Sequence, residues 1–157
     1  MIKGVITGDL VHSTNIAAKW RQTVVNVLHK CVAEFLPLTF VKLEMYRGDS
    51  FQVVVDKPEY ALAIAIALRA KLKAETPDGQ KLWDARLAVG VGDISFENDN
   101  IVTSDGEAFR LSGHSFDHIG KKRLSISTPW PDFNTNIELV TRFADDLITS
   151  WTAKQAR

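Results

Sequence analysis

The order of strand-like and helix-like segments is the feature that most constrains the fold of this chain. Short segments rich in β-branched residues alternate with two long helical patterns in the order strand, helix, strand, strand, helix, strand. These six segments are residues 2–7, 15–36, 40–46, 51–56, 58–75 and 85–96. The order is the βαββαβ pattern of ferredoxin-like domains, in which helices pack on a largely antiparallel sheet. We therefore predict an α+β fold with a ferredoxin-like core.

A C-terminal extension follows this core. We expect a turn at 97–100, a short strand at 101–103, a helix at 106–120, a strand at 123–128 and an amphipathic helix at 135–151. Small residues interrupt the apolar pattern of segment 85–96, which indicates a close approach by a neighbouring element. The last helix carries its large apolar residues on one side; they are Ile137, Val140, Phe143, Leu147 and Trp151.

Length and composition favour a single cytoplasmic domain. The chain has 157 residues, a formal net charge of zero and one cysteine, Cys31. Zero net charge gives no basic field that would attract nucleic acid or an anionic membrane. A single cysteine excludes an internal disulfide and fits a reducing compartment. We also expect no membrane association, since no apolar run is long enough to span a bilayer.

The stretch GVITGDLVHST, residues 4–14, places a carboxylate where the first strand ends. A second carboxylate, Asp49, lies in the turn RGDS between the second and third strands. The ferredoxin-like order brings the end of the first strand beside this hairpin, so we expect Asp9 and Asp49 to meet. Two such carboxylates repel each other unless a cation or a proton lies between them. Mg²⁺ is commonly held by one or two carboxylates together with phosphate oxygens and water.

The residues after Asp9 suit a phosphate group. Residues 10–14 precede a helical pattern, so their backbone N–H groups and the helix dipole would favour an anion there. Ser13, Thr14 and Asn15 are suitable caps for that helix. His12 and Arg47 are candidates for phosphate contact, although the default interpretation of each is a solvated loop side chain.

A purely structural alternative stays open. An aspartate before a helix is often a cap, and Gly-Asp in a hairpin is often only a turn. In that case the two aspartates bind nothing, and the chain is a protein-interaction domain without a ligand. The motifs of P-loop NTPases, α/β-hydrolases and dinucleotide-binding folds are absent from the sequence, which argues against those enzyme classes.

Four motifs carry a resemblance to a known family. ITGDLVHST, YRGDSFQVVV, ARLAVGVGDI and SDGEAF, in this order, resemble the SatD family of bacterial proteins. They are also similar, more distantly, to the catalytic domains of class III adenylate and guanylate cyclases, over roughly residues 3–128. The resemblance implies that Asp9 and Asp49 bind Mg²⁺ or Mn²⁺, with the Leu10 carbonyl as a further ligand. It also implies that the loop after them faces nucleotide phosphates; its residues are Val11, His12, Ser13 and Thr14.

The chain departs from the cyclase pattern at other positions. Where cyclases carry an Asn and an Arg after their last core strand, alignment on Gly106 gives Arg110 and His114. The position of the base-selecting lysine falls at Leu43. The resemblance therefore implies a metal-dependent domain that binds a nucleotide or another phosphorylated small molecule and regulates without full cyclase activity. An active cyclase or another phosphoryl- or nucleotidyl-transfer enzyme is the alternative.

The resemblance also bears on partners and on domain limits. Cyclases build their sites between two subunits, which implies a homodimer in which Arg110 and His114 act across the interface. We expect residues 1–130 to form the cyclase-like domain and residues 131–157 a C-terminal helix. Longer SatD-like chains continue from a segment like WTAKQ into a helix-turn-helix segment, which is absent here, so we expect no DNA binding by these residues alone.

Overall fold

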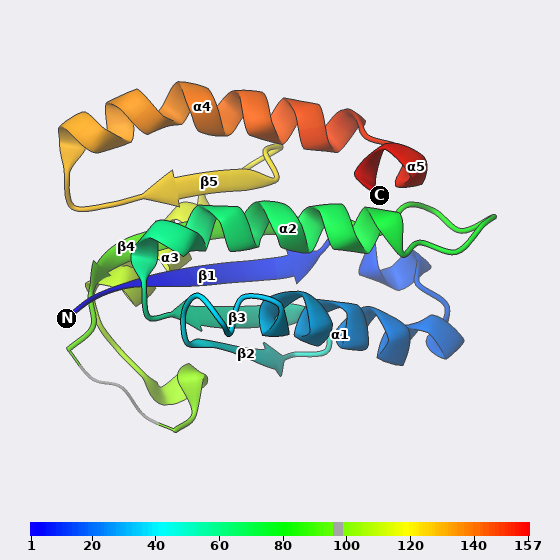
Figure 1. The fold of residues 1–157 in the computed structure, drawn as a ribbon, viewed down its shortest axis with the longest axis horizontal. Coiled ribbons are helices and arrows are strands. Elements are labelled where there is room, and N and C mark those ends of the chain that lie inside the picture. Colours follow the sequence, from blue (N-terminus) through cyan, green and yellow to red (C-terminus); the bar gives the residue numbers. More distant parts are fainter. Residues whose placement is uncertain (96–98) are drawn as a thin grey trace.

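The protein forms one five-stranded sheet covered by helices, in a computed structural model that describes residues 1–95 and 99–157 apart from the side chain of Val102 (Figure 1). The strands are β1 Ile2–Leu10, β2 Val41–Tyr46, β3 Ser50–Val55, β4 Ala85–Asp93 and β5 Leu124–Ser127. The helices are α1 Ala18–Ala33, α2 Ala61–Ala74, α3 Glu107–Asp117, α4 Pro131–Ser150 and α5 Ala153–Ala156, with 3₁₀ turns η1 Ser13–Asn15, η2 Pro58–Tyr60 and η3 Ile101–Thr103.

The strand order confirms the ferredoxin-like core and its extension. The sheet runs β2-β3-β1-β4-β5, so that β1 lies in the middle. It pairs antiparallel with β3 and β4, and β2 pairs antiparallel with β3. The added strand β5 pairs parallel to β4. The fold class is α+β, as the sequence predicts.

The helices lie on both faces of the sheet. The main apolar core lies between the sheet and helices α1 and α2, where Ile6, Leu28 and Leu68 are fully buried. Helix α3 packs on the opposite face, over β1 and β4. It approaches closely because β4 has glycine at position 90, where a Cβ atom would lie 2.3 Å from the carbonyl oxygen of Ala108. This contact confirms the close approach predicted from the small residues of this segment.

Three local expectations were wrong. Residues 101–103 form the 3₁₀ turn η3 rather than a strand, and their Ile101 packs beneath α3. Helix α1 begins at Ala18 instead of residue 15, and its N-cap Ala17 makes no side-chain cap hydrogen bond. Ser13, Thr14 and Asn15 therefore form the separate turn η1 and do not cap α1. Part of the turn expected at 97–100 lies outside the described residues.

Helix α4 begins at Pro131, four residues earlier than expected, because proline suits the first turn of a helix. It runs along the β5 edge of the sheet (Figure 1). Its buried residues are Thr141, Asp145 and Ile148, so the inner face of this helix is largely polar.

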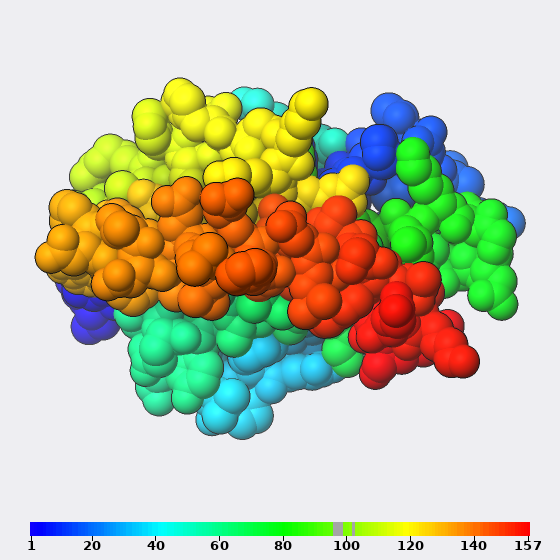
Figure 2. All heavy atoms as spheres, turned by 90° about the horizontal axis from the view of Figure 1, so that it is seen from above, coloured from blue at the N-terminus to red at the C-terminus, as the bar shows by residue number. Residues whose placement is uncertain are grey.

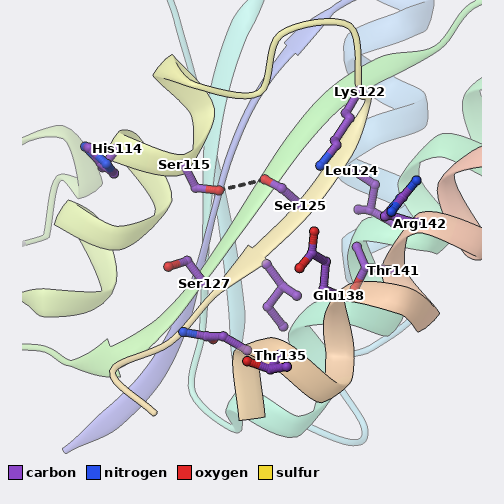
Figure 3. A pocket seen from close by; sticks show the side chains of 12 residues that line it. His114, Ser115, Lys122, Leu124, Ser125, Ser127, Thr135, Glu138, Thr141 and Arg142 are labelled. Atoms are coloured by element: carbon purple, nitrogen blue, oxygen red, sulfur yellow. Dashed lines mark hydrogen bonds between the residues drawn. The ribbon is translucent and has the colours of Figure 1, made fainter. Parts of the chain in front are cut away.

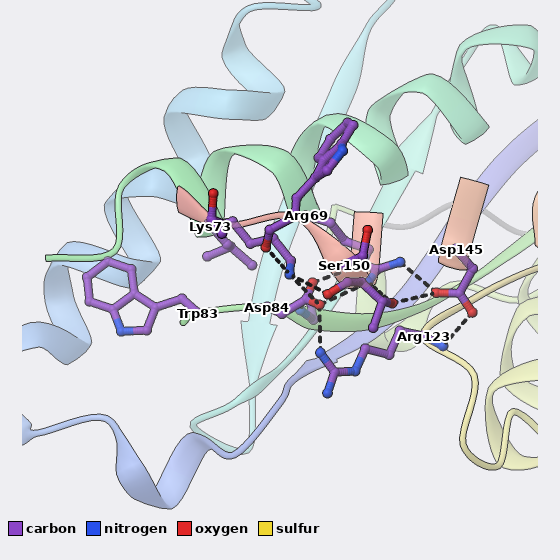
Figure 4. A network of polar contacts seen from close by, with 12 residues as sticks. Arg69, Lys73, Trp83, Asp84, Arg123, Asp145 and Ser150 are labelled. Atoms are coloured by element: carbon purple, nitrogen blue, oxygen red, sulfur yellow. Dashed lines mark hydrogen bonds and ion pairs between the residues drawn. The ribbon is translucent and has the colours of Figure 1, made fainter. Parts of the chain in front are cut away.

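A buried ion network attaches α4 to the rest of the protein (Figure 4). Arg69 of α2, which is fully buried, donates two hydrogen bonds of 2.9 Å to Asp84 and one of 2.7 Å to Asp145 of α4. Arg123 donates a further bond of 2.9 Å to Asp84. Lys73 binds the carbonyl oxygens at the end of α4. Because each buried charge has a partner, the network is compatible with the low dielectric of the interior.

Candidate site at the carboxyl end of β1

The two aspartates predicted to meet lie at neighbouring positions of the sheet. Asp9 is opposite Ser50, the residue after Asp49, in the β1–β3 register. The backbone N–H of Leu10 donates a 3.0 Å hydrogen bond to the carbonyl oxygen of Asp49. Ser13 then reaches back from η1 and donates a 2.8 Å hydrogen bond to the Asp49 carboxylate. The end of β1, the loop after it and the β2–β3 turn therefore form one cluster.

Arg86 is the cation of this cluster, and it comes from β4. Its Nε and Nη2 atoms donate to the two carboxylate oxygens of Asp9 at 3.0 and 2.6 Å. These hydrogen bonds raise the pKa of the Arg86 guanidinium above its ordinary value. The remaining nitrogen, Nη1, has no hydrogen-bond partner within residues 1–95 and 99–157. Since the Arg86 side chain is 40% exposed, this donor is available to a ligand.

The loop after β1 is held by its backbone. Val11 donates its N–H to the carbonyl oxygen of Asp84 at 2.9 Å, and His12 adopts a left-handed conformation with φ of 51° before η1 begins. His12 and Thr14 are exposed, whereas Val11 and Ser13 are half-buried. The loop therefore exposes the polar side chains of His12 and Thr14, and the Leu10 side chain points into the core.

The β2–β3 turn contains a strained residue. Arg47 has a φ of 52° and is followed by Gly48 with a φ of 79°. A non-glycine residue pays roughly 1–2 kcal/mol to occupy the left-handed region. Such outliers cluster at functional sites, which makes Arg47 a candidate ligand contact with a structural observation behind it.

Tyr46, at the end of β2, lies close enough to Asp9 and Arg47 to feel their charges. Burial raises the pKa of its hydroxyl, the negative charges of Asp9 and Asp117 raise it further, and Arg47 opposes the shift. Tyr46 therefore remains a protonated hydrogen-bond donor at neutral pH. Asp117 belongs to the end of α3, which brings this helix to the edge of the same cluster.

The donor set does not fit a divalent cation as it is arranged. Within the described ranges, no group of three or more His, Cys, Asp or Glu side chains is placed to hold a metal ion. Both carboxylate oxygens of Asp9 are bound by Arg86. A guanidinium already supplies the positive charge that Mg²⁺ or Mn²⁺ would bring, so a metal would have to displace it.

The other two candidate residues lie elsewhere. Arg110 is in the first part of α3 and forms an exposed pair with Asp105 at 3.1 Å. The end of α3, not its start, approaches Asp9, since Phe116 contacts the Arg86 guanidinium. His114 stacks on His118 with 4.3 Å between ring centroids. The structure therefore does not bring Arg110 to the Asp9 cluster.

His114 lines a different hollow, between α3, β5 and α4 (Figure 3). This pocket has a volume of about 340 Å³ and a mostly polar lining. Ser115 and Ser125 are joined across it by a 2.7 Å hydrogen bond. Lys122, Glu138 and Arg142 at its rim are exposed, so their charges are solvated and the pocket shows no built ligand site.

Sequence reasoning missed Arg86, Tyr46 and Asp84. Arg86 is the one charged residue between Ala85 and Gly92 in an otherwise apolar strand. This lone charge could have marked Arg86 as a candidate site residue. Tyr46 alternates with buried residues along β2, which indicates a strand with one polar face. Nothing in the sequence indicated that the Asp84 side chain would pair with Arg69 and Arg123 and lie 4.0 Å from the ammonium group of Lys73.

The fold has known counterparts. The chain is similar to the active GGEEF domain of a diguanylate cyclase from Vibrio cholerae, with a TM-score of 0.57 and 16% identity over 80% of this chain and 83% of that one. It is also similar to the dimeric guanylyl cyclase domain of the RhoGC fusion protein from Blastocladiella emersonii, with a TM-score of 0.57 and 13% identity over 74% and 73%. A bacterial light-regulated adenylyl cyclase gives a TM-score of 0.54 and 9% identity over 80% and 75%.

The fold is that of nucleotide cyclase catalytic domains. At these identities the likeness shows the fold alone. No family model matches the sequence, and no curated protein matches it, so the resemblance to SatD stays a prediction. None of the helices in the described part of the chain has the length and apolar character that a membrane span requires.

Proposed function

We propose that this protein is a regulatory domain that binds a nucleotide, or another phosphorylated small molecule, at the carboxyl end of β1. The observation that carries the proposal is the Arg86 guanidinium, held in place by Asp9 with Nη1 left for a ligand. The Tyr46 hydroxyl feels the charges of both Asp9 and Arg47, and His12 in the loop after β1 stays a predicted phosphate contact. The bidentate contact with Asp9 holds the guanidinium group in place, and guanidinium N–H groups are suited to phosphate oxygens.

Two observations support binding without cyclisation. The sequence lacks the cyclase residues at the positions of Leu43, Arg110 and His114, and Arg110 pairs with Asp105 away from Asp9. A related solved structure, the catalytic core of a rhodopsin-guanylyl cyclase, is in complex with ATPαS. That likeness suggests ATP and GTP as the first ligands to try.

Metal dependence is the part of the function that the geometry does not favour. We propose that the phosphate is bound through Arg86 and needs no Mg²⁺ or Mn²⁺. Binding of a cation by Asp9, the Leu10 carbonyl and Asp49 stays a prediction, and it requires Arg86 to leave Asp9. The two versions differ in their response to chelation.

Calorimetric titration of ATP and of GTP tests the proposal, with Mg²⁺, with Mn²⁺ and with EDTA. We expect binding in all three solutions and at least a tenfold loss in Arg86→Gln. Lys57→Gln, which removes an exposed cation before η2 at the other end of β1, is the matched control and should bind normally. Binding only with metal, lost in Asp9→Asn, would favour the metal-dependent version. Absence of binding by either nucleotide and by inorganic pyrophosphate would refute the proposal.

The same samples test the alternative of an active enzyme. Incubation of ATP and GTP with Mn²⁺, followed by chromatography of the nucleotides, detects cyclisation or hydrolysis. We expect no turnover. A product that disappears in Asp49→Asn would instead assign a phosphoryl- or nucleotidyl-transfer activity to this site.

A further inference from the structure

Helix α4 shows its apolar side to the solvent. Its inner face is attached by Thr141, Asp145 and Ile148, and the large apolar residues predicted to share one side mostly point away from the sheet. Val140, Phe143 and Leu147 are 56%, 66% and 57% exposed. This arrangement is the reverse of an ordinary surface helix, whose apolar stripe faces the core.

The exposed residues follow a heptad pattern. Phe133, Val140 and Leu147 are spaced by seven residues, with Phe143 at the alternate position; Asn136 and Ser150, also exposed, complete the series. Apolar residues spaced alternately by three and four positions form a line, here called the seam, along which one helix packs on another. The seam runs for the whole length of α4, so its natural occupant is a helix of similar length.

Nothing in the described part of the chain covers this surface. Figure 2 looks onto the outside of α4, which lies open along the molecule. Six apolar side chains of α4 and its N-cap are about half exposed; they are Trp130, Phe133, Leu139, Val140, Phe143 and Leu147. Large apolar side chains expose on the order of 100 Å² each when half open, which gives a patch of roughly 500 Å².

A second copy of the chain matches this area. A symmetric pair would bury about 1,000 Å² on the two copies together, which reaches the lower bound for a specific interface. A two-fold axis also lets one surface serve both partners. Here the surface has a ridge and a hollow. The ridge is Phe143 and Leu147, and the hollow is an apolar groove of about 430 Å³ at the start of α4, between Phe133, Ile137 and Leu62 of α2.

An antiparallel arrangement brings the ridge of each copy to the hollow of the other. With the axis near Val140, Leu147 of one copy lies opposite Phe133 of the second copy, because both are seven residues from the axis. Antiparallel helix dipoles attract each other, whereas parallel dipoles side by side repel.

We infer that the protein forms a homodimer through α4, with the two α4 helices antiparallel along the seam Phe133–Val140–Phe143–Leu147. The inference is independent of the function proposed for the end of β1, because it uses only residues of α4 and of the adjoining groove.

Sedimentation analysis tests the dimer. We expect wild type to sediment at twice the 17.5 kDa mass of the chain at tens of micromolar, and the double variant Phe143→Arg, Leu147→Arg to sediment as a monomer with an unchanged circular dichroism spectrum. The matched control is Phe40→Arg, since Phe40 is 56% exposed outside α4, and it should remain dimeric. A wild type that is monomeric up to about 100 µM, or a dimer that survives the double variant, would overturn the inference.

Cysteine cross-linking tests the orientation. The native Cys31 is 1% exposed, so an introduced cysteine is the only accessible thiol. Under mild oxidation we expect Val140→Cys to cross-link to itself. Phe133→Cys should cross-link to Leu147→Cys when the two variants are mixed, and not to itself. Efficient Phe133→Cys self-cross-linking would show a parallel pair and contradict the antiparallel assignment.

Discussion

Arg86 of β4 grips Asp9 of β1 through two hydrogen bonds, at 3.0 and 2.6 Å, across neighbouring strands. The register makes these residues direct partners, so the pair is fixed by the sheet rather than by a loop. A carboxylate that is expected to bind a metal is therefore neutralised from within the chain. The second aspartate of the site, Asp49, accepts hydrogen bonds from the hydroxyls of Ser13 and Ser50.

Removing the guanidinium should convert this site into one that binds cations. In Arg86→Met, Asp9 and Asp49 are left near each other without a neutralising charge, which favours a hard divalent ion. We expect Mn²⁺ at about 100 times its Kd to stabilise this variant by roughly 2.7 kcal/mol, which is several degrees in Tm, and to leave wild type unchanged. Thermal melts with Mn²⁺ and with EDTA measure this. An equal Mn²⁺ response in wild type would show that Arg86 does not block the site.

Replacing Arg47 by glycine should relieve backbone strain and at the same time weaken ligand binding. Its φ of 52° suits glycine, so Arg47→Gly should stabilise the fold by about 1 kcal/mol and weaken nucleotide binding. Gly48→Ala is the complementary variant: a Cβ there meets nothing within 4 Å, so only its φ of 79° should cost stability, by about 1 kcal/mol. Urea unfolding and calorimetry measure the two effects. A destabilised Arg47→Gly would show that the arginine is held by native contacts.

Asp84 should dominate the acid stability of the protein. Burial alone would raise the pKa of its carboxyl, yet hydrogen bonds from Arg69 and Arg123 hold it below the ordinary value of 3.8. A depressed pKa stabilises the native state above pH 3.8, and this contribution is lost as the pH falls through the lower native value. Asp84→Asn should lose about 3–5 kcal/mol at pH 7, because it leaves buried cations without a partner.

The pH profile separates this effect from simple loss of packing. The free energy of unfolding of wild type should fall steeply below pH 4, and that of Asp84→Asn should be flatter there. Asp132→Asn, an exposed aspartate of the same helix that the network anchors, should keep the wild-type profile. Parallel acid limbs for wild type and Asp84→Asn would contradict the assignment.

Glycine at position 90 should be needed for α3 to reach the sheet. An added Cβ would lie 2.3 Å from a carbonyl oxygen and 2.5 Å from a backbone nitrogen of α3, and backbone cannot move aside as a flexible side chain can. We expect Gly90→Ala to cost about 1–3 kcal/mol in urea unfolding. Gly113→Ala is the control, since its Cβ meets nothing within 4 Å and alanine favours a helix. A neutral Gly90→Ala would mean that α3 can shift at little cost.

The sequence was sufficient for the core because its periodicities are strong. Strand 50–55 and helix 61–74 lie close to their expected limits, and the βαββαβ order alone placed Asp9 beside the hairpin of Asp49. The start of α1 was misjudged because Ser13, Thr14 and Asn15 are good cap residues that bond locally in η1. Residues 101–103 were misjudged because three apolar or β-branched residues favour a strand whenever no partner is considered.

The sequence analysis did not identify Arg86 because its pairing with Asp9 is long-range. Arg86 is 77 residues from Asp9 along the chain, and only the β1–β4 register makes them neighbours. The side on which α4 packs was equally hidden. The apolar stripe of α4 was predicted correctly, but a stripe does not show whether it faces the core or the solvent. Here the opposite face packs inward, because Asp145 on that face pairs with the buried Arg69.

Asp84 links the buried ion network under α4 to the loop after β1. The side chain of Asp84 accepts hydrogen bonds from the guanidinium groups of Arg69 and Arg123. Asp145 of α4 accepts from the Arg69 guanidinium and from the backbone N–H of Arg123, and the Asp84 backbone carbonyl accepts from the N–H of Val11. A displacement of α4 that breaks the contact between Arg69 and Asp145 would also disturb Asp84, because Arg69 binds both aspartates. Asp84 in turn holds the loop after β1 through its backbone carbonyl. We therefore expect a displacement of α4 to change the position of the loop after β1.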